Sequence, residues 1–508
     1  MIFKELNTHY ELDWLKRWNQ YSPQNKALTD GDTGEALTYA QLYSLSLAGA
    51  HYLKNKHQIK KGDRVIHFST NEISSFILFF ALTRLGATLV PINYRLTPRE
   101  LSYVITNAEP QLIVYESTFE GILKEIKSEI HVDEKNWLRL TGENSFSAHI
   151  QNSNSVESEF LSDEKTTALI IYTSGTTGFP KGAMISHQML FWNSINTTLR
   201  LDISEKDAAV IFLPLFHTGG WNVLSTPFLH RGAHIILTKK FDADQVLQLS
   251  EKHQTTLLFG VPTTMGMMTR SDRFANTNLK SLRYAIVGGE PMPIENIKVW
   301  QNKNIAIRQG YGLTEFGPNV FSLNENDSVR KMGSIGFPNF YVEVQVVDEQ
   351  NKKLAANEVG ELWLKGPMAM TGYWKNPKAT EETFEEGWLK TGDLVYFDDE
   401  NYFYVVGRKK DMYKSGGENV YPAELEQVIQ QLAWVKESAV IGVKDAQWGE
   451  VGHAFVSIKA DYFNEQELRD HCLKNLAKFK NPKYFTKLTE LPKGDSGKIL
   501  KRKLVELI

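Results

Sequence analysis

The sequence is poor in cysteine, and it has neither a long hydrophobic run nor an excess of charge of one sign. Its single cysteine, Cys472, excludes an internal disulfide in a chain of 508 residues. Cys472 recurs with Leu468 and Leu476 every four residues, so we expect it in the core-facing stripe of a helix. Apolar runs such as residues 77–82 are too short to span a membrane, and the first residues lack the pattern of a secretory signal. A cytoplasmic location is therefore expected.

The charges are nearly balanced. The 57 Lys and Arg stand against 60 Asp and Glu, which gives a formal net charge of −3. This balance does not indicate nucleic acid or an anionic membrane surface as a partner. We therefore expect small-molecule ligands held by local sites and no transmembrane segment; the oligomeric state, for example a homodimer, stays open.

The chain alternates between strand-like and helix-like patterns. Apolar runs at residues 168–172, 256–261 and 284–287 stop at Gly, Pro or Ser, and helical periodicity follows each of them. This alternation is typical of an α/β body with a largely parallel sheet. From about residue 341 apolar and polar residues alternate, which predicts a smaller β subdomain within that body. The last hundred or so residues carry their own helix and strand patterns, so we expect domains at 1–409 and 410–508, the second a small α+β domain.

A loop rich in Ser, Thr and Gly follows the strand pattern near residue 170 and precedes a helix that should begin near Ser186 and His187. Such a loop can direct backbone N–H groups, hydroxyls and the Lys181 ammonium at a polyphosphate. It is not a Walker A loop, because Pro180 and Gly182 stand where that motif needs Gly and Ser or Thr.

The string TSGTTGFPKG at residues 173–182 resembles the signature of the adenylate-forming, or AMP-binding, enzyme superfamily, which includes acyl- and aryl-CoA synthetases, peptide adenylation domains and luciferases. The resemblance continues in order through LPLFHTGG, VGGEPMP, QGYGLTEFGP, GWLKTGD, GRKKDMYKSGGENVYPAELE and LPKGDSGKILKRKL. It implies an acyl-CoA synthetase that uses ATP, Mg²⁺ and CoA. The acid would first form an acyl-adenylate with release of pyrophosphate, and its acyl group would then pass to CoA.

The resemblance also implies residue roles in the adenylation step. Glu315 would bind magnesium, Thr314 would touch the α-phosphate, and Lys498 would bridge the substrate carboxylate and the phosphate. Asp393 would accept hydrogen bonds from the ribose hydroxyls, with Arg408 supporting the same sugar. The phosphate loop and the two turns around adenine would contribute Thr173, Ser174, Gly175, Thr176, Thr177, Gly178 and Lys181, then Gly288, Gly289, Glu290 and Pro291, and then Gly310, Tyr311 and Gly312.

For the second step the resemblance implies that the C-terminal domain is mobile and rotates about Lys410. After this rotation, Gly416 and Gly417 would line the pantetheine tunnel, with Trp448 and Phe479 as further CoA contacts. The neighbours of Lys498 in the sequence, Lys501, Arg502 and Lys503, are expected to be solvated.

The segments around the expected acyl site limit the choice of acid. His217 stands where amino-acid-activating relatives carry an aspartate, and Gly312 stands where acetate-specific relatives carry a tryptophan. Together with Gly288 these residues predict a pocket open to a larger, less polar acid, whose walls would include Trp221, Asn222, Phe259, Val261 and Met265.

A medium- or long-chain fatty acid is the first expectation, and an aryl or phenylpropanoid-type acid is the second. Two alternatives stay open: a fatty acyl-AMP ligase that delivers to a carrier protein, and a non-catalytic binding protein.

Overall fold

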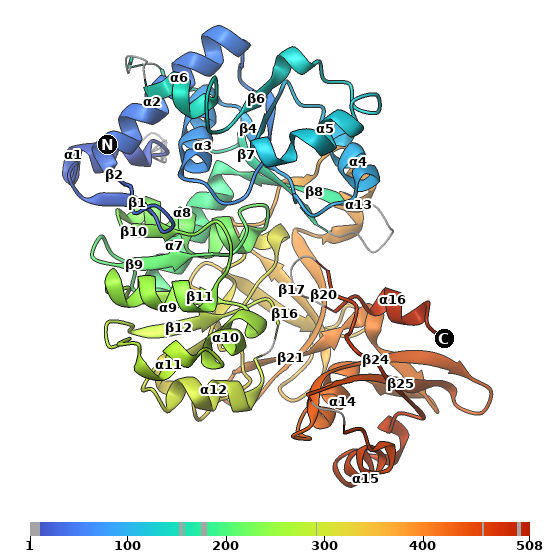
Figure 1. The fold of residues 1–508 in the computed structure, drawn as a ribbon. Helices are drawn as coiled ribbons and strands as arrows, with labels where there is room; N and C mark the ends of the chain where they lie inside the picture. The colour runs from blue at the N-terminus through green and yellow to red at the C-terminus, as the bar shows by residue number, and fades with distance from the viewer. Residues whose placement is uncertain are drawn as a thin grey trace, which may run out of the picture.

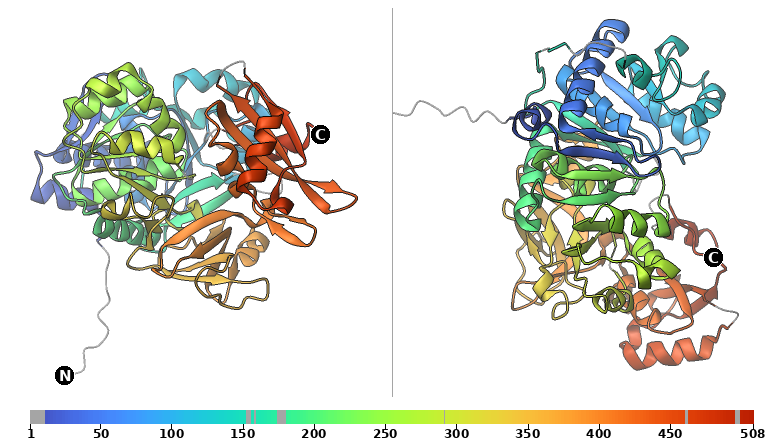
Figure 2. Two further views of the ribbon diagram at one scale, coloured as in Figure 1. Left: turned by 90° about the horizontal axis from the view of Figure 1, so that it is seen from below. Right: turned by 60° about the vertical axis from the view of Figure 1, so that its left-hand side comes forward.

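The structure, a computed structural model, describes residues 11–151, 156–157, 159–173, 180–290, 292–459, 462–494 and 499–508. A large body contains the chain up to about residue 408, and a small domain, red in Figure 1, follows it. Figure 2 shows from two further sides that the small domain lies at one end of the body, next to the part drawn in orange. This arrangement confirms the predicted α/β body with a small α+β domain.

The first sheet of the body is mostly parallel and has helices on both faces. On β3 (Arg64–Phe68), Val65 packs into one hydrophobic cluster, whereas Ile66 and Phe68 pack into another. The seven-stranded order is β18-β8-β7-β4-β3-β5-β6, with β4 (Thr88–Pro91), β5 (Leu112–Tyr115), β6 (Trp137–Arg139), β7 (Thr167–Thr173), β8 (Lys181–Ser186) and β18 (Gly372–Tyr373). The covering helices are α2 (Tyr39–His57), α3 (Ile73–Leu85) and α6 (Phe146–Gln151) on one face, and α4 (Pro98–Ala108) and α5 (Glu120–Glu125) on the other.

Local sequence explains where these helices begin and end. Helix α4 starts with a capping box in which the Thr97 side chain accepts from the Glu100 N–H and the Glu100 side chain accepts from the Thr97 N–H. Pro98 occupies its first turn, where a missing N–H costs nothing. Helix α3 ends at Gly86, whose φ of 70° is accessible to glycine without strain.

Two further sheets continue the α/β pattern. The first has the order β2-β1-β10-β9, with β1 (Lys26–Asp30), β2 (Ala36–Thr38), β9 (Ala208–Ile211) and β10 (His234–Leu237). The second has the order β11-β12-β13-β14-β15, with β11 (Leu257–Gly260), β12 (Tyr284–Val287), β13 (Ile307–Tyr311), β14 (Phe321–Ser322) and β15 (Phe337–Pro338). Strands β11, β12 and β13 are parallel, as are β1, β10 and β9. Their helices are α1 (Trp14–Tyr21), α7 (His187–Leu201), α8 (Ser225–Arg231), α9 (Ala243–Lys252), α10 (Pro262–Thr269), α11 (Asp272–Asn276) and α12 (Ile294–Gln301).

The region after residue 341 forms the expected β subdomain. Antiparallel pairing joins β16 (Glu343–Val347), β17 (Gly360–Lys365), β19 (Phe384–Glu385), β20 (Trp388–Phe397) and β21 (Phe403–Arg408), and α13 (Pro377–Thr383) lies between β18 and β19 in the chain.

The small domain has its own sheet and core. Its sheet contains β22 (Tyr413–Ser415), β23 (Glu418–Val420), β24 (Val435–Asp445), β25 (Gly449–Ile458) and β26 (Tyr484–Lys487). Its helices are α14 (Pro422–Ile429), α15 (Glu465–Asn475) and α16 (Lys501–Val505). Cys472 lies on α15 and is fully buried in the core of the small domain, as its spacing predicts. The expected boundary at 409/410 falls in the short connection between β21 and β22.

Sequence analysis did not predict strand β8 of the body. The expected path ran from the strand near residue 170 through the loop directly into a helix, and the helix does begin at His187 with Ser186 as its N-cap. However, residues 181–186 first form β8, which pairs antiparallel with β7. Strands β7 and β8 therefore form a β-hairpin, and residues 174–179 between them lie outside the described part of the chain. Among the described residues, no helix has both the length and the apolar character needed to cross a bilayer.

Candidate active site

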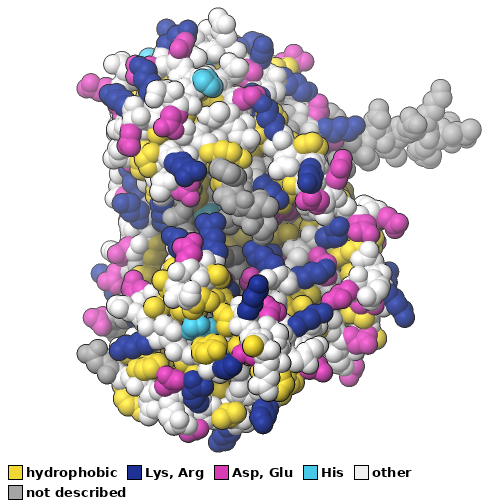
Figure 3. Space-filling view, turned by 90° about the vertical axis from the view of Figure 1, so that its right-hand side faces the viewer, with side chains coloured by type: hydrophobic (Ala, Val, Ile, Leu, Met, Phe, Trp, Pro, Cys, Tyr) yellow, Lys and Arg dark blue, Asp and Glu magenta, His cyan; other side chains and the backbone are white. Residues whose placement is uncertain are grey.

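A large cleft separates the body from the small domain. Its volume is about 3820 Å³, and it is lined by the ends of β9, β11, β12, β13, β20 and β21, by α14 and by residues 493–494 and 499–503. Figure 3 shows the molecule hollowed between an upper and a lower part, with Lys and Arg side chains around the hollow. Although the chain as a whole is nearly neutral, these cations make the surroundings of the cleft suitable for polyanionic ligands.

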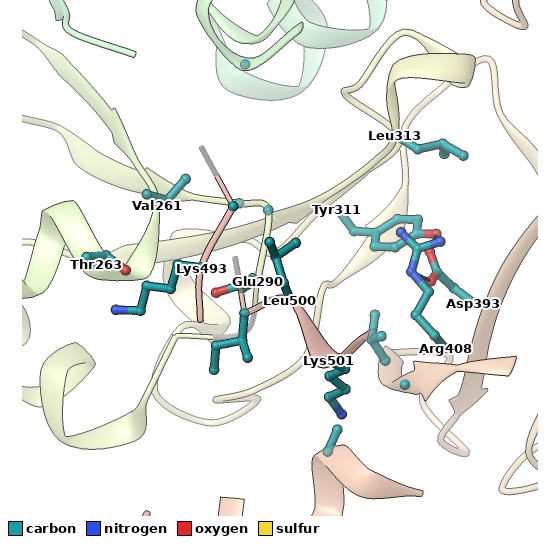
Figure 4. A pocket seen from close by; sticks show the side chains of 18 of the residues that line it. Val261, Thr263, Glu290, Tyr311, Leu313, Asp393, Arg408, Lys493, Leu500 and Lys501 are labelled. Atoms are coloured by element: carbon teal, nitrogen blue, oxygen red, sulfur yellow. Dashed lines mark hydrogen bonds and ion pairs between the residues drawn. The ribbon is translucent and has the colours of Figure 1, made fainter. Parts of the chain in front are cut away.

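One cluster in the cleft joins Tyr311, Asp393 and Arg408. The Tyr311 hydroxyl donates to Oδ2 of Asp393 at 2.5 Å, and Nε of Arg408 lies 2.8 Å from Oδ1. Asp393 and Arg408 are register partners on β20 and β21, so the hairpin itself fixes their pairing. Burial, and then the nearby Asp393 carboxylate, raise the pKa of Tyr311 well above its usual value, which keeps its hydroxyl a donor. Figure 4 shows the three side chains directed toward one another.

The two predicted adenine turns lie together on this side of the cleft. Residues 288–290 follow β12, and residues 310–312 end β13 and follow it. Gly289 has a φ of 87°, which disfavours other residues. The Met292 N–H donates to Oε1 of Gln309 at 2.9 Å and so ties the first turn to the neighbouring strand. Pro291 lies outside the described residues.

A second cluster lies at the base of the phosphate hairpin. Thr173 and Lys181 are register partners where β7 and β8 meet the loop. Oε1 of Glu315, in the short turn Thr314–Phe316, accepts from the Tyr373 hydroxyl at 2.9 Å and from the Thr173 hydroxyl at 3.4 Å. The Lys181 ammonium lies 5.3 Å from the centre of the Tyr373 ring. The loop residues Ser174, Gly175, Thr176, Thr177 and Gly178 lie outside the described part of the chain.

The C-terminal segment enters the cleft from the opposite side. Lys493 and Leu500 line the cleft together with Glu290 and Val261 (Figure 4). The Lys493 ammonium pairs with Glu437 of β24 in the small domain at 2.5 Å, and Lys493 and Ile499 form an antiparallel bridge. Lys498 lies between them in the sequence but outside the described residues. Lys501 was expected to be solvated, and this expectation is wrong: its ammonium pairs with Glu426 at 2.7 Å and its side chain is only 22% exposed.

The expected acyl-site residues divide into two groups. His217, Gly288, Phe259 and Val261 line the cleft. Trp221 does not: it is fully buried, with ring centroids 5.1 and 5.2 Å from those of Phe76 and Phe79. Asn222 and Met265 are also buried in the body and are not among the lining residues. Trp221, Asn222 and Met265 were expected in the pocket wall, and the structure places them in the core instead.

Gly312 lines the cleft, but its missing side chain points elsewhere. A Cβ atom at this position would lie 1.6 Å from the carbonyl oxygen of Pro318. The glycine is required by this close backbone approach, so it is not simply an open pocket floor. A tryptophan at residue 312 would disturb the turn before it could shorten the pocket.

The expected CoA residues lie in the small domain but not along the cleft in this arrangement. Gly416 and Gly417, with φ of 61° and 89°, form the turn between β22 and β23, and Gly416 packs against the half-exposed Trp448. Phe479 packs against the core of the small domain. None of these four is among the described residues that line the cleft.

Comparison with known proteins agrees with this arrangement. A family model described as AMP-binding enzyme matches residues 15–374, and one described as AMP-binding enzyme C-terminal domain matches residues 424–498. The chain belongs to the AMP-binding enzyme family.

Similar members of the AMP-binding family cover almost the whole chain. A feruloyl-CoA synthase of Amycolatopsis sp is 34% identical over 96% of this chain and 97% of its own length. The long-chain-fatty-acid–CoA ligase FadD13 of Mycobacterium tuberculosis is 33% identical over 97% of this chain and 98% of its own. The structure of o-succinylbenzoate CoA synthetase of Bacillus subtilis with its acyl-adenylate intermediate superimposes with a TM-score of 0.87, at 30% identity and 97% coverage of both chains.

The second cluster, at the base of the phosphate hairpin, can accommodate the magnesium that AMP-binding enzymes use with ATP. In the described part of the chain, no group of three or more His, Cys, Asp or Glu side chains could cage a metal. Mg²⁺ is usually held by one or two carboxylates together with substrate phosphates, and Glu315 offers such a carboxylate beside the phosphate hairpin.

Sequence reasoning missed Tyr373, which contacts both Glu315 and Lys181. The one local signal in the sequence was Gly372 before the aromatic pair Tyr373 and Trp374. This signal says nothing about Glu315, which lies 58 residues away in the chain, or about Lys181, which is more distant still.

Proposed function

We propose that the acid used by this ATP-dependent acid:CoA ligase is a medium- or long-chain fatty acid. An aryl acid of the phenylpropanoid type is the second candidate. The relatives themselves differ, since their names refer to feruloyl, long-chain fatty and o-succinylbenzoate acids at similar identity. The choice therefore depends on the acyl side of the cleft.

One observation supports the fatty acid: an apolar wall that crosses several neighbouring strand ends. Gly288 follows β12, Phe259 lies in β11, Phe212 follows β9 and Phe241 follows β10, and all four residues line the cleft. Phe212 and Phe241 are in contact, with ring centroids 5.0 Å apart. Within a sheet, strands lie about 4.8 Å apart. The Thr256 N–H, directly before β11, donates to the Ala208 carbonyl of β9 at 2.8 Å, so the two sheets meet there and the ends of β10, β9, β11 and β12 span roughly 14 Å. This span is longer than a single aromatic ring requires.

Within this wall the Phe259 ring lies between two glycines that also line the cleft, Gly219 and Gly288. A Cβ atom on Gly288 would lie 3.5 Å from its Cε2, and a Cβ atom on Gly219 would lie 3.8 Å from its Cε1. Both glycines therefore keep the two edges of the ring accessible. His217 also lines the cleft, and an imidazole, unlike a carboxylate, would not select an α-ammonium group.

The proposed first step is attack of the acid's carboxylate oxygen on the α-phosphorus of ATP, which gives acyl-adenylate and pyrophosphate. Asp393 and Arg408 would hold the ribose, and the turns at Gly289 and Tyr311 would hold adenine. Lys181, Thr314 and Lys498 would stabilise the phosphate charge. Magnesium, held by Glu315, would neutralise part of the charge on the phosphate oxygens.

For the second step we infer a rotation of the small domain about Lys410. Lys409, the preceding residue, is held to the body by an ion pair with Glu361 at 2.8 Å, so the chain is fixed immediately before the proposed pivot. Rotation would bring Gly416 and Gly417, and with them Trp448 and Phe479, toward CoA. The CoA thiolate would then attack the acyl carbonyl and release AMP.

The test is magnesium-dependent pyrophosphate release with linear acids of graded length and with cinnamate-type acids, each with and without CoA. We expect a clear optimum among the linear acids and faster turnover with CoA. A preference for aryl acids would favour the second candidate. Turnover that is unchanged by CoA but requires an added carrier protein would indicate a fatty acyl-AMP ligase. No pyrophosphate release with any of the acids would contradict the proposal.

A variant at the far end of the wall makes the test specific. Phe241→Ala should reduce kcat/KM for the longest acids and leave the shortest ones unchanged, because only a long chain reaches this ring. Phe384→Ala is the matched control, since Phe384 is also a partly buried phenylalanine but packs against the body core and not along the cleft. Equal effects of Phe241→Ala on all chain lengths would refute the extended wall as the chain site.

A further inference from the structure

Residues 370–374 connect the two sides of the phosphate site. On one side, the Met370 N–H donates to the backbone carbonyl of Glu315 at 2.9 Å, and the Tyr373 hydroxyl donates to the Glu315 carboxylate, also at 2.9 Å. On the other side, the Trp374 N–H donates to the carbonyl of Gly182 at 2.7 Å, and β18 pairs with β8. The segment therefore holds Glu315 against the strand that begins at Lys181.

The ring of Tyr373 serves the same site in a second way. The Lys181 ammonium lies over this ring at 5.3 Å from its centre, a distance at which a cation and an aromatic face attract each other. A single side chain thus contacts both groups to which the phosphate-binding roles are assigned: the carboxylate through its hydroxyl and the ammonium through its ring.

The backbone leaves this tyrosine little freedom. The Tyr373 N–H donates to Oγ1 of Thr380 at 2.9 Å, and a Cβ atom on Gly372 would lie 2.9 Å from Cγ2 of the same threonine. The next side chain, Trp374, donates from its ring N–H to the carbonyl of Asn107 at 2.9 Å. The orientation of Tyr373 is therefore fixed from both neighbouring residues.

We propose that Tyr373 is a positioning residue for magnesium–ATP binding, which orients the Glu315 carboxylate through its hydroxyl and the Lys181 ammonium through its ring. The proposal rests on the roles assigned above to Glu315 and Lys181. Both recorded hydrogen bonds of the Glu315 side chain within the described residues go to Oε1, which directs this oxygen toward the protein.

The experiment uses ATP and MgCl₂ as probes and needs no acid. ATP binding to the whole protein is measured by calorimetry over a range of Mg²⁺ concentrations. Tyr373→Phe removes only the hydroxyl, and a hydrogen bond to a charged group corresponds to roughly a 10-fold change in an equilibrium constant. We therefore expect about a 10-fold higher half-saturating Mg²⁺ concentration. Tyr373→Leu, which also removes the ring, should weaken ATP binding about 3-fold further.

The matched control is Tyr39→Phe. Tyr39 is fully buried, and its hydroxyl donates to the carbonyl of Ala233 at 2.7 Å, away from the cleft. This control loses a similar buried hydrogen bond, so it should reduce stability without changing the Mg²⁺ dependence. Use of a supplied acyl-adenylate with CoA should also stay within about twofold of wild type in Tyr373→Phe, because that reaction does not need magnesium–ATP.

A double-mutant cycle with Glu315→Gln completes the test. If the hydroxyl acts through Glu315, then Tyr373→Phe should have little effect in the Glu315→Gln background. Additive effects, an unchanged Mg²⁺ dependence in Tyr373→Phe, or an equal shift in Tyr39→Phe would each overturn the inference. Failure of the wild type to bind ATP with Mg²⁺ would instead overturn the function on which the inference rests, so the two failures are distinguishable.

Discussion

Asp393→Asn tests the proposed ribose site with a minimal change of shape. An ionised carboxylate only accepts hydrogen bonds, whereas an amide donates from one of its two positions. Arg408 has no acceptor, so the amide oxygen must face Arg408 and the NH₂ group must face Tyr311. The Tyr311 hydroxyl can turn and accept from this NH₂ group, so the protein contacts can be rebuilt. The lost charge should cost less than about 1 kcal/mol of unfolding free energy, because the Arg408 side chain is 46% exposed.

The ligand should be affected much more than the fold. The variant replaces an acceptor of a ribose hydroxyl, and a hydrogen bond to a charged group contributes about 1.5–3 kcal/mol, so KM for ATP should rise about 10- to 150-fold. Pyrophosphate release against ATP concentration measures this change, and a thermal melt measures stability. Asp398→Asn is the control, since Asp398 pairs with Lys331 near the other end of the same hairpin and outside the cleft. A folded Asp393→Asn variant with wild-type KM for ATP would refute the ribose assignment.

Three further predictions concern the turn at Gly312, the loss of stability at low pH, and Lys498. Gly312→Ala should destabilise the protein by roughly 1–3 kcal/mol in denaturant unfolding, because its Cβ would meet backbone at 1.6 Å, whereas Gly288→Ala should not; equal stability would contradict the geometry. The Lys61 ammonium holds the pKa of Asp163 at about 2, below the ordinary 3.8, so the stability it contributes is present above pH 3.8 and is lost as the pH falls to about 2. Lys61→Met should therefore melt slightly below wild type near neutral pH and match it below about pH 2; a constant difference would exclude this ion pair as the cause. Lys498→Ala should abolish acyl-adenylate formation while leaving CoA-dependent use of a supplied adenylate largely intact, and equal loss of both reactions would contradict a role in the first step alone.

The sequence was informative where function depends on a continuous segment. The loop at residues 173–182, the turns at Gly289 and Tyr311 and the carboxylate of Asp393 each lie in a short string whose meaning does not depend on distant residues. The parallel strands could also be predicted, because a buried strand shows as an apolar run that ends at glycine or proline. Strand β8 was missed because its residues run without a turn into the helix that follows.

Tertiary structure alone decided what each inward-facing residue meets. Trp221 and Phe259 are both large, apolar and shielded from solvent, yet one packs in the core and the other lines the cleft. Hydrophobic periodicity reports that a side chain faces inward, and it cannot distinguish a packed neighbour from a ligand cavity because both favour the same residues. The same limit applies to polar contacts: Lys501 pairs with Glu426, and Tyr373 contacts Glu315, only because elements distant in the chain come together. The sequence by itself therefore determined the family, the chemistry and the order of the elements, whereas the fold determined which residues support the catalytic groups.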